Sequence, residues 1–136
     1  MGMARMDQDS LEEAVMRKVK VAAVQMRCTD QVEKNIAHAE ELVRKAAAKG
    51  AQIILLPELF ERRYDYYSFA KPVEENEAVR HFSKIAKELS VVLPISFYER
   101  DKNRLFNTVA VLDADGTNLG IYRKTHIPDD HYYQEK

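Results

Sequence analysis

One carboxylate stands out at the end of an apolar run in the segment IILLPELF, residues 53–60. The run leads into Pro57, and Glu58 follows with apolar residues after it. The proline ring fixes its own φ and keeps the residue before it out of the helical region, so the chain turns rigidly. An acid among apolar neighbours is expected to have a raised pKa, because its ionised form is desolvated. Glu58 is therefore a candidate general base, and an ordinary surface acid is the alternative.

A lysine occupies a comparable place near the end of the sequence. Lys124 directly follows the apolar stretch LGIY and an arginine. A lysine at a strand end can stabilise a developing oxyanion, while a solvated charged loop is the other interpretation. Two histidines and two aspartates follow within residues 126–131. Such a set could bind a metal, but its spacing matches no defined site, so we expect no metal.

The only cysteine is Cys28, between an apolar stretch and the start of a helical pattern. A helix N-terminus can lower a thiol pKa, which would suit a nucleophile. An isolated cysteine is more often a small apolar filler, and we keep that alternative. A single cysteine excludes a disulfide within the chain and fits a reducing compartment, so a cytoplasmic protein is expected.

Composition excludes several classes of function. The 136 residues carry a net charge of −1, which gives no electrostatic basis for binding nucleic acid or an anionic membrane. No apolar run approaches the roughly 20 residues of a membrane span. A glycine-rich phosphate loop is absent from the sequence, so no nucleotide cofactor is expected. Residues 1–17 are expected to form a polar leader rather than a signal peptide, followed by one domain over residues 18–136.

The elements that must position these residues begin with a βαβ pattern. Residues 19–26 and 51–57 are dense in apolar and β-branched side chains and predict two buried strands. Helical spacing lies between them, with a capping box predicted at Asp30 and Glu33 and a stop at residues 49–50. This order predicts a parallel strand pair joined by a helix.

The second half predicts a helix over residues 79–89 and three strands, over residues 91–99, 105–113 and 117–124. Pro94 cannot donate to a ladder, so an edge or irregularity is expected there. Short turns join these strands, which predicts antiparallel pairing. The fold class is therefore α/β, a mixed sheet with helices on at least one face. The βαβ start alone would also suit a flavodoxin-like binding module, but that needs a phosphate loop.

The chain resembles the carbon–nitrogen hydrolase (nitrilase) superfamily in three segments, VAAVQM, GAQIILLPELF and LFNTVAVLDADGTNLGIYRKTHIPDD. The pattern is most similar to the branch of N-carbamoylputrescine amidases. The resemblance covers nearly the whole chain from residue 19. It implies a nitrilase-like αββα sandwich, of which this chain would be a truncated N-terminal part. One departure is the segment after Phe60, where the family usually has a longer loop rich in glycine and aromatic residues.

The resemblance also implies a Cys-Glu-Lys catalytic trio. Glu58 matches the family's general base and Lys124 its catalytic lysine. The nucleophilic cysteine is expected beyond the Tyr-Arg-Lys segment and is absent from these 136 residues, since Cys28 does not match its motif. A basic substrate tail would suit an acidic or aromatic pocket, for which Tyr64, His126 and Asp129 are the candidates.

The implied activity is hydrolysis of N-carbamoylputrescine to putrescine, carbon dioxide and ammonia, in polyamine biosynthesis, with no cofactor. The alternatives are a β-ureidopropionase-like or ω-amidase-like specificity, or a non-catalytic fragment acting only as an interaction module. We expect a small-molecule ureido or amide substrate, no nucleic acid or membrane partner, and a homo-oligomer of the complete protein. The 136-residue chain alone is expected to be inactive.

Overall fold

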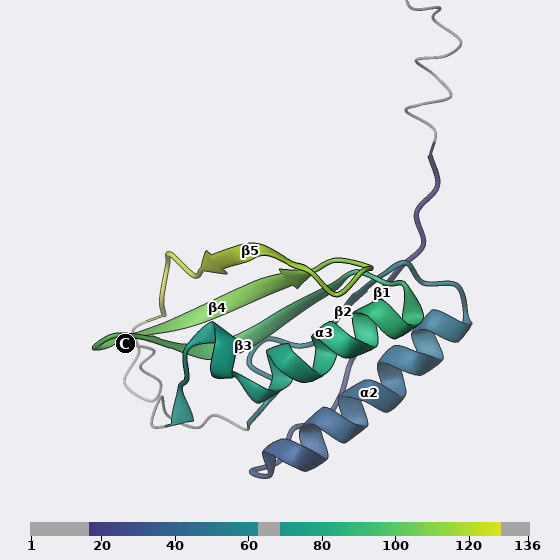
Figure 1. Ribbon diagram of the computed structural model, residues 1–136. Coiled ribbons are helices and arrows are strands. Elements are labelled where there is room, and N and C mark those ends of the chain that lie inside the picture. The colour runs from purple at the N-terminus through teal and green to yellow at the C-terminus, as the bar shows by residue number, and fades with distance from the viewer. Residues whose placement is uncertain (1–16, 63–68, 129–136) are drawn as a thin grey trace, which may run out of the picture.

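The computed structural model describes residues 17–62 and 69–128 (Figure 1). The order is a βαβ unit, then a short 3-10 helix, a second α-helix and three strands. The elements are β1 (Val21–Ala23), α2 (Val32–Ala48), β2 (Ile53–Leu55), η2 (Val73–Glu75), α3 (Glu77–Leu89), β3 (Leu93–Asp101), β4 (Arg104–Leu112) and β5 (Asn118–Arg123). All the predicted elements of the domain are present, although β1 and β2 are shorter than expected.

The strands form a two-stranded and a three-stranded sheet, which an isolated bridge joins into one mixed layer. β1 and β2 pair in parallel, whereas β3, β4 and β5 pair antiparallel in that order. An isolated parallel bridge between Ile53 and Val92 links the two groups, and the Ile54 N–H donates to the Val92 carbonyl at 3.0 Å. Pro94 pairs with Val111 of β4, just beyond the point where β3 meets β2. The predicted topology is therefore confirmed, including the parallel pair and the hairpins.

Both helices cover the same face of the sheet (Figure 1). Apolar residues of α2 and α3 recur at helical spacing and meet alternate residues of the strands, as the two periodicities require. The resulting core is built around Val43 of α2, Phe82 of α3, Ile54 of β2 and Ile95 of β3, all fully buried. Neither of these α-helices has the length and apolar character of a membrane span.

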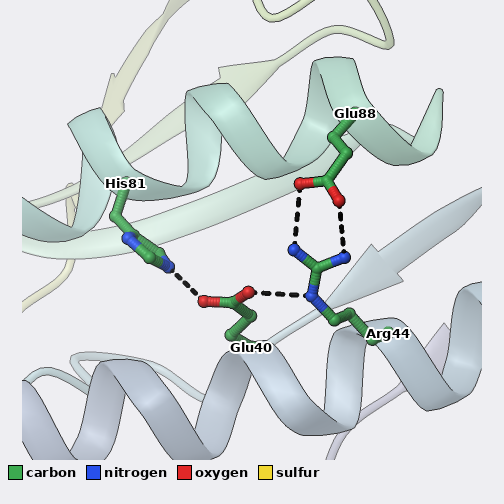
Figure 2. Close-up of polar contacts among 4 residues, drawn as sticks. All are labelled: Glu40, Arg44, His81 and Glu88. Atoms are coloured by element: carbon green, nitrogen blue, oxygen red, sulfur yellow. Dashed lines mark hydrogen bonds and ion pairs between the residues drawn. The ribbon is translucent and has the colours of Figure 1, made fainter.

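A polar cluster lies between the two helices and joins them. Figure 2 shows His81 and Glu88 of α3 pointing toward Glu40 and Arg44 of α2. Arg44 donates from Nε to Glu40 at 2.8 Å and from both terminal nitrogens to Glu88 at 2.9 Å. His81 Nε2 lies 2.6 Å from Glu40 Oε2. The cluster fixes the two helices relative to one another over the core.

The capping box predicted at Asp30 and Glu33 is wrong. The N-cap of α2 is Gln31, whose side chain makes no capping hydrogen bond. Thr29 holds the start of the helix instead. Its hydroxyl accepts the Gln31 N–H at 3.2 Å and contacts Asn35 Oδ1 at 2.9 Å. Asn35 lies one helical turn in and is buried, so its side chain reaches back over the helix start. The predicted stop is confirmed, since α2 ends at Ala48 and Gly50 has a φ of 87°.

Within residues 17–62 and 69–128, nothing covers the opposite face of the sheet. Val21 of β1 and Tyr122 of β5 are 67% and 64% exposed, and Leu55 of β2 is half exposed. The sequence predicted that residues 19–26 and 51–57 are buried strands, and for this face that prediction is wrong. Continuous apolar runs indicate strands that are covered on both faces, but the helices here cover only one.

Candidate functional site

Glu58 and Lys124 meet on the open face. Lys124 Nζ lies 3.0 Å from Glu58 Oε1, although 66 positions separate the two residues. Glu58 follows β2 and Lys124 follows β5, so each side chain comes from the end of a strand. The structure thus brings together the two residues that the sequence singled out. An acid and an ammonium group in contact are a suitable pair for proton transfer beside a developing oxyanion.

The turn that carries Glu58 is held in an unusual conformation. Leu59 has a φ of 51°, a left-handed value that costs an L-residue with a Cβ roughly 1–2 kcal/mol. Its N–H donates to the Ser96 hydroxyl of β3 at 2.9 Å. Leu59 also packs with Ala70 and Tyr98 in a small apolar cluster. These contacts, together with the rigid Pro57, fix the backbone that presents the Glu58 carboxylate.

Asn107 of β4 connects the two candidates. Its side-chain Nδ2 donates to Glu58 Oε1 at 2.9 Å, and its backbone carbonyl accepts the Lys124 N–H at 2.8 Å. Asn107 is only 5% exposed. Sequence reasoning missed it, because an asparagine inside a strand pattern gives no signal until the strand pairing is known.

An open groove of about 360 Å³ surrounds these groups. Ser96, Asn107, Tyr122 and Leu55 line it together with Glu58 and Lys124. The Glu58 side chain is 57% exposed and that of Lys124 is 30% exposed. The desolvated environment predicted for Glu58 is therefore wrong for this chain, because nothing among the described residues covers the carboxylate from the open side.

Arg123 and Lys124 are neighbours with different roles, because successive side chains of a strand point to opposite faces. Arg123 turns away from the groove and donates to Glu99 at 2.9 and 2.6 Å and to Asp101 at 2.9 Å. Burial raises the pKa of Glu99, but the hydrogen bonds from Arg123 and Thr108 outweigh it and hold that pKa below its usual range. Arg123 therefore anchors β5 to β3 and leaves Lys124 for the groove.

A second buried acid, Glu61, lies three residues after Glu58. It is 7% exposed, and it accepts hydrogen bonds from Asn76 Nδ2 at 2.9 Å and the Tyr98 N–H at 3.1 Å. Desolvation raises the pKa of Glu61, although both hydrogen bonds favour the ionised form. Asn76 is also the N-cap of α3. Glu61 therefore ties the segment after β2 to the start of α3 and to β3.

The other candidates lie apart from the groove or outside the described residues. Cys28 packs against the apolar core, and burial raises the pKa of its thiol, which agrees with the filler interpretation. His126 is exposed on the segment after Lys124 and does not line the groove. Tyr64 and Asp129 lie outside the described residues, as does most of the histidine and aspartate set considered for a metal.

The comparisons with known proteins point to the same family. The family described as carbon-nitrogen hydrolase matches residues 20–136. An N-carbamoylputrescine amidase from Oryza sativa subsp. japonica is 52% identical over 88% of this chain and 42% of the relative. A citrullinase from Francisella tularensis is 42% identical over 89% of this chain and 45% of the relative. The chain therefore spans less than half the length of these curated relatives.

Solved structures agree at the level of the fold. The crystal structure of a carbon-nitrogen hydrolase from Helicobacter pylori G27 superposes with a TM-score of 0.69 at 30% identity. It covers 82% of this chain, which corresponds to 41% of the solved chain. The α/β class with a mixed sheet and the nitrilase-like architecture are thereby confirmed. With the family matched across almost all of its sequence, the chain belongs to the carbon-nitrogen hydrolases.

Proposed function

We propose that this chain supplies the acid–base and oxyanion-binding half of an amidase that cleaves a linear ureido C–N bond, with N-carbamoylputrescine as the substrate. The observation that carries the proposal is the 3.0 Å contact between Glu58 and Lys124 at an open groove. The kinship with N-carbamoylputrescine amidases, at 52% identity over 88% of this chain, supports the substrate.

The proposed reaction needs a cysteine thiol from the part of the enzyme beyond these residues. Glu58 takes the thiol proton, and the thiolate sulfur attacks the carbamoyl carbon. Lys124 stabilises the negative charge on the tetrahedral oxygen. Glu58 returns the proton to the leaving nitrogen, and ammonia departs. Water then cleaves the carbamoyl–sulfur bond, and the resulting carbamate decomposes to putrescine and carbon dioxide.

A second substrate is favoured by one specific observation. The relative from Francisella tularensis is a citrullinase, and it is 42% identical to this chain. Citrulline and N-carbamoylputrescine both carry a terminal ureido group, so the same acid, lysine and thiol could act on either. They differ in the tail, which is an amine in one and an amino acid in the other. The tail-binding residues therefore decide between them, and Tyr64, His126 and Asp129 stay candidates for that role.

The experiment is a comparison of ammonia release from the two substrates by the complete protein. We expect higher kcat/KM for N-carbamoylputrescine. Glu58→Gln and Lys124→Met should each lower kcat by about 10²-fold or more, since each removes a group acting on the reacting atoms. Glu74→Gln and Lys84→Met, at exposed positions on η2 and α3, are the matched controls and should retain activity. Full activity in Glu58→Gln would overturn the proposal.

Residues 1–136 alone are predicted to release no ammonia, because the only cysteine is Cys28, which packs against the core. Activity of that chain would contradict the role given to a cysteine beyond it. A place in polyamine biosynthesis, a cytoplasmic location and a homo-oligomer of the complete protein belong to the same proposal. The lone cysteine supports the location, because it suits a reducing compartment.

A further inference from the structure

Among the described residues, the two groups that touch the Glu58 carboxylate both contact the same oxygen. Asn107 Nδ2 donates to Oε1 at 2.9 Å, and Lys124 Nζ lies 3.0 Å from that oxygen as well. Oε2 is the oxygen that neither of them takes. A carboxylate held through one oxygen by two donors has a fixed orientation, and a proton is disfavoured on the oxygen that already accepts both.

The side chain and the backbone of Asn107 make hydrogen bonds to different residues. The backbone carbonyl accepts the Lys124 N–H at 2.8 Å and sets where the lysine leaves β5. The buried side-chain amide donates to the Glu58 carboxylate. A side-chain substitution therefore leaves the backbone bond to Lys124 in place. This separation allows the effect on Glu58 to be tested without moving the lysine's attachment.

We propose that Asn107 is a positioning residue that holds Glu58 through Oε1 and so makes Oε2 the oxygen that accepts the proton. This inference rests on the proposed role of Glu58 as general base. In the step itself, the S–H bond of the thiol breaks and an O–H bond forms at Oε2, which leaves a thiolate and a neutral carboxyl group. In this role Asn107 acts through Glu58 and exchanges no proton itself.

The test compares Asn107→Ala and Asn107→Asp with the wild type in the complete protein. Asn107→Ala removes a donor to the ionised carboxylate, so kcat should fall about tenfold at neutral pH with KM little changed. The acid limb of the pH profile of kcat/KM should move to higher pH. Asn107→Asp replaces the amide donor by a second carboxylate, which should move that limb further.

Asn35→Ala is the matched control. Asn35 is also a buried asparagine, and its Nδ2 donates to the Glu61 carbonyl at 2.7 Å, away from the groove. Asn35→Ala should lower thermal stability and leave the acid limb of the pH profile of kcat/KM unchanged. If the limb of Asn107→Ala coincides with that of the wild type, or if Asn35→Ala shifts it equally, the positioning role is overturned.

A second readout does not depend on turnover. Difference infrared spectra, taken between each protein and its Glu58→Gln counterpart, isolate the carboxylate stretching bands of Glu58. The separation between the symmetric and antisymmetric bands should change in Asn107→Ala relative to the wild type, because Oε1 loses one hydrogen-bond donor. If the enzyme hydrolyses neither ureido substrate but the bands still shift, the proposed function fails while the contact between Asn107 and Glu58 stands. Unchanged bands would overturn the positioning role even in an active enzyme.

Discussion

Glu58 and Glu61 lie three positions apart in opposite environments. The first carboxylate opens onto a groove beside Lys124, whereas the second is buried and accepts two hydrogen bonds. The turn with a positive φ at Leu59 separates them. A change in the direction of the backbone over three residues therefore decides which carboxylate opens onto the groove and which one fastens the fold.

Glu61→Ala should destabilise the chain markedly. The substitution leaves the Asn76 amide and the Tyr98 N–H without their acceptor in a buried place. Each unsatisfied buried donor costs about 1–3 kcal/mol. Chemical denaturation should show a loss of about 2 kcal/mol or more. A loss below about 0.5 kcal/mol would mean that water or another acceptor replaces the carboxylate.

Glu61→Gln gives a prediction with a defined pH dependence. Burial raises the folded-state pKa of Glu61, so the protonated form of this group stabilises the folded wild type. This stabilisation is fully present below the unfolded-state pKa and is lost as the pH rises through the folded-state pKa. Glutamine does not titrate. The stability of Glu61→Gln relative to the wild type should therefore increase from acid to neutral pH, measured by denaturation at several pH values. A difference that stays constant with pH would contradict the raised pKa.

The sequence allowed part of this site to be predicted. Glu58 and Lys124 follow apolar runs, and parallel and antiparallel pairing brings such strand ends together, so both could be singled out in advance. Asn107 and the burial of Glu61 could not, because each depends on partners from other elements. Asn107 reaches the site only through the register of β4 with β5, and Glu61 is enclosed by α3 and β3.

At the scale of elements, the strands and helices followed from periodicity, but the start of α2 did not. Asp30 and Glu33 have the spacing of a capping box, yet Thr29 and Asn35 hold the helix start. A capping box is a local pattern, whereas Asn35 is fixed by its long-range bond to the Glu61 carbonyl. Tertiary contacts therefore override the local signal at this position.

Substitutions at the start of α2 should show whether Thr29 or Asp30 stabilises the helix end. Thr29→Ala removes the acceptor of the Gln31 N–H and should cost about 1 kcal/mol of unfolding free energy. Asp30→Ala, the matched neighbour, should change it by less than about 0.5 kcal/mol. Thermal or chemical denaturation of the two variants provides the measurement. The reverse order of effects would restore Asp30 as the cap.

The cluster between α2 and α3 gives a second prediction for the elements. The hydrogen bond from Arg44 lowers the pKa of Glu40, burial opposes this, and the contact with His81 adds to the lowering. The ionised carboxylate therefore stabilises the fold above its unfolded pKa, and this stability is lost as the pH falls through the lower folded pKa. Glu40→Gln should cost up to about 1 kcal/mol at neutral pH, and this cost should shrink as the pH falls into the acid range. A cost that is independent of pH would assign the effect to packing.

At the scale of the whole molecule, the two faces of the sheet differ. One face is filled by α2 and α3, and the other presents Val21, Leu55 and Tyr122 to solvent. Proteins that fold as soluble monomers rarely leave a large contiguous apolar patch uncovered. The same open face carries Glu58 and Lys124, so any segment or partner that covers this face of the sheet would also close the groove.

Residues 1–136 on their own should therefore self-associate. The open face offers apolar surface, and the net charge of −1 provides little repulsion between copies. Sedimentation velocity should show species larger than a monomer at micromolar concentration, together with binding of a hydrophobic dye. Val21→Thr combined with Leu55→Thr should reduce both signals, because the two side chains are exposed on that face. Lys84→Thr with Lys87→Thr, exposed on α3, is the control on the opposite side and should not reduce them. A monomer that binds no dye would show that the face is covered by other residues of the same chain.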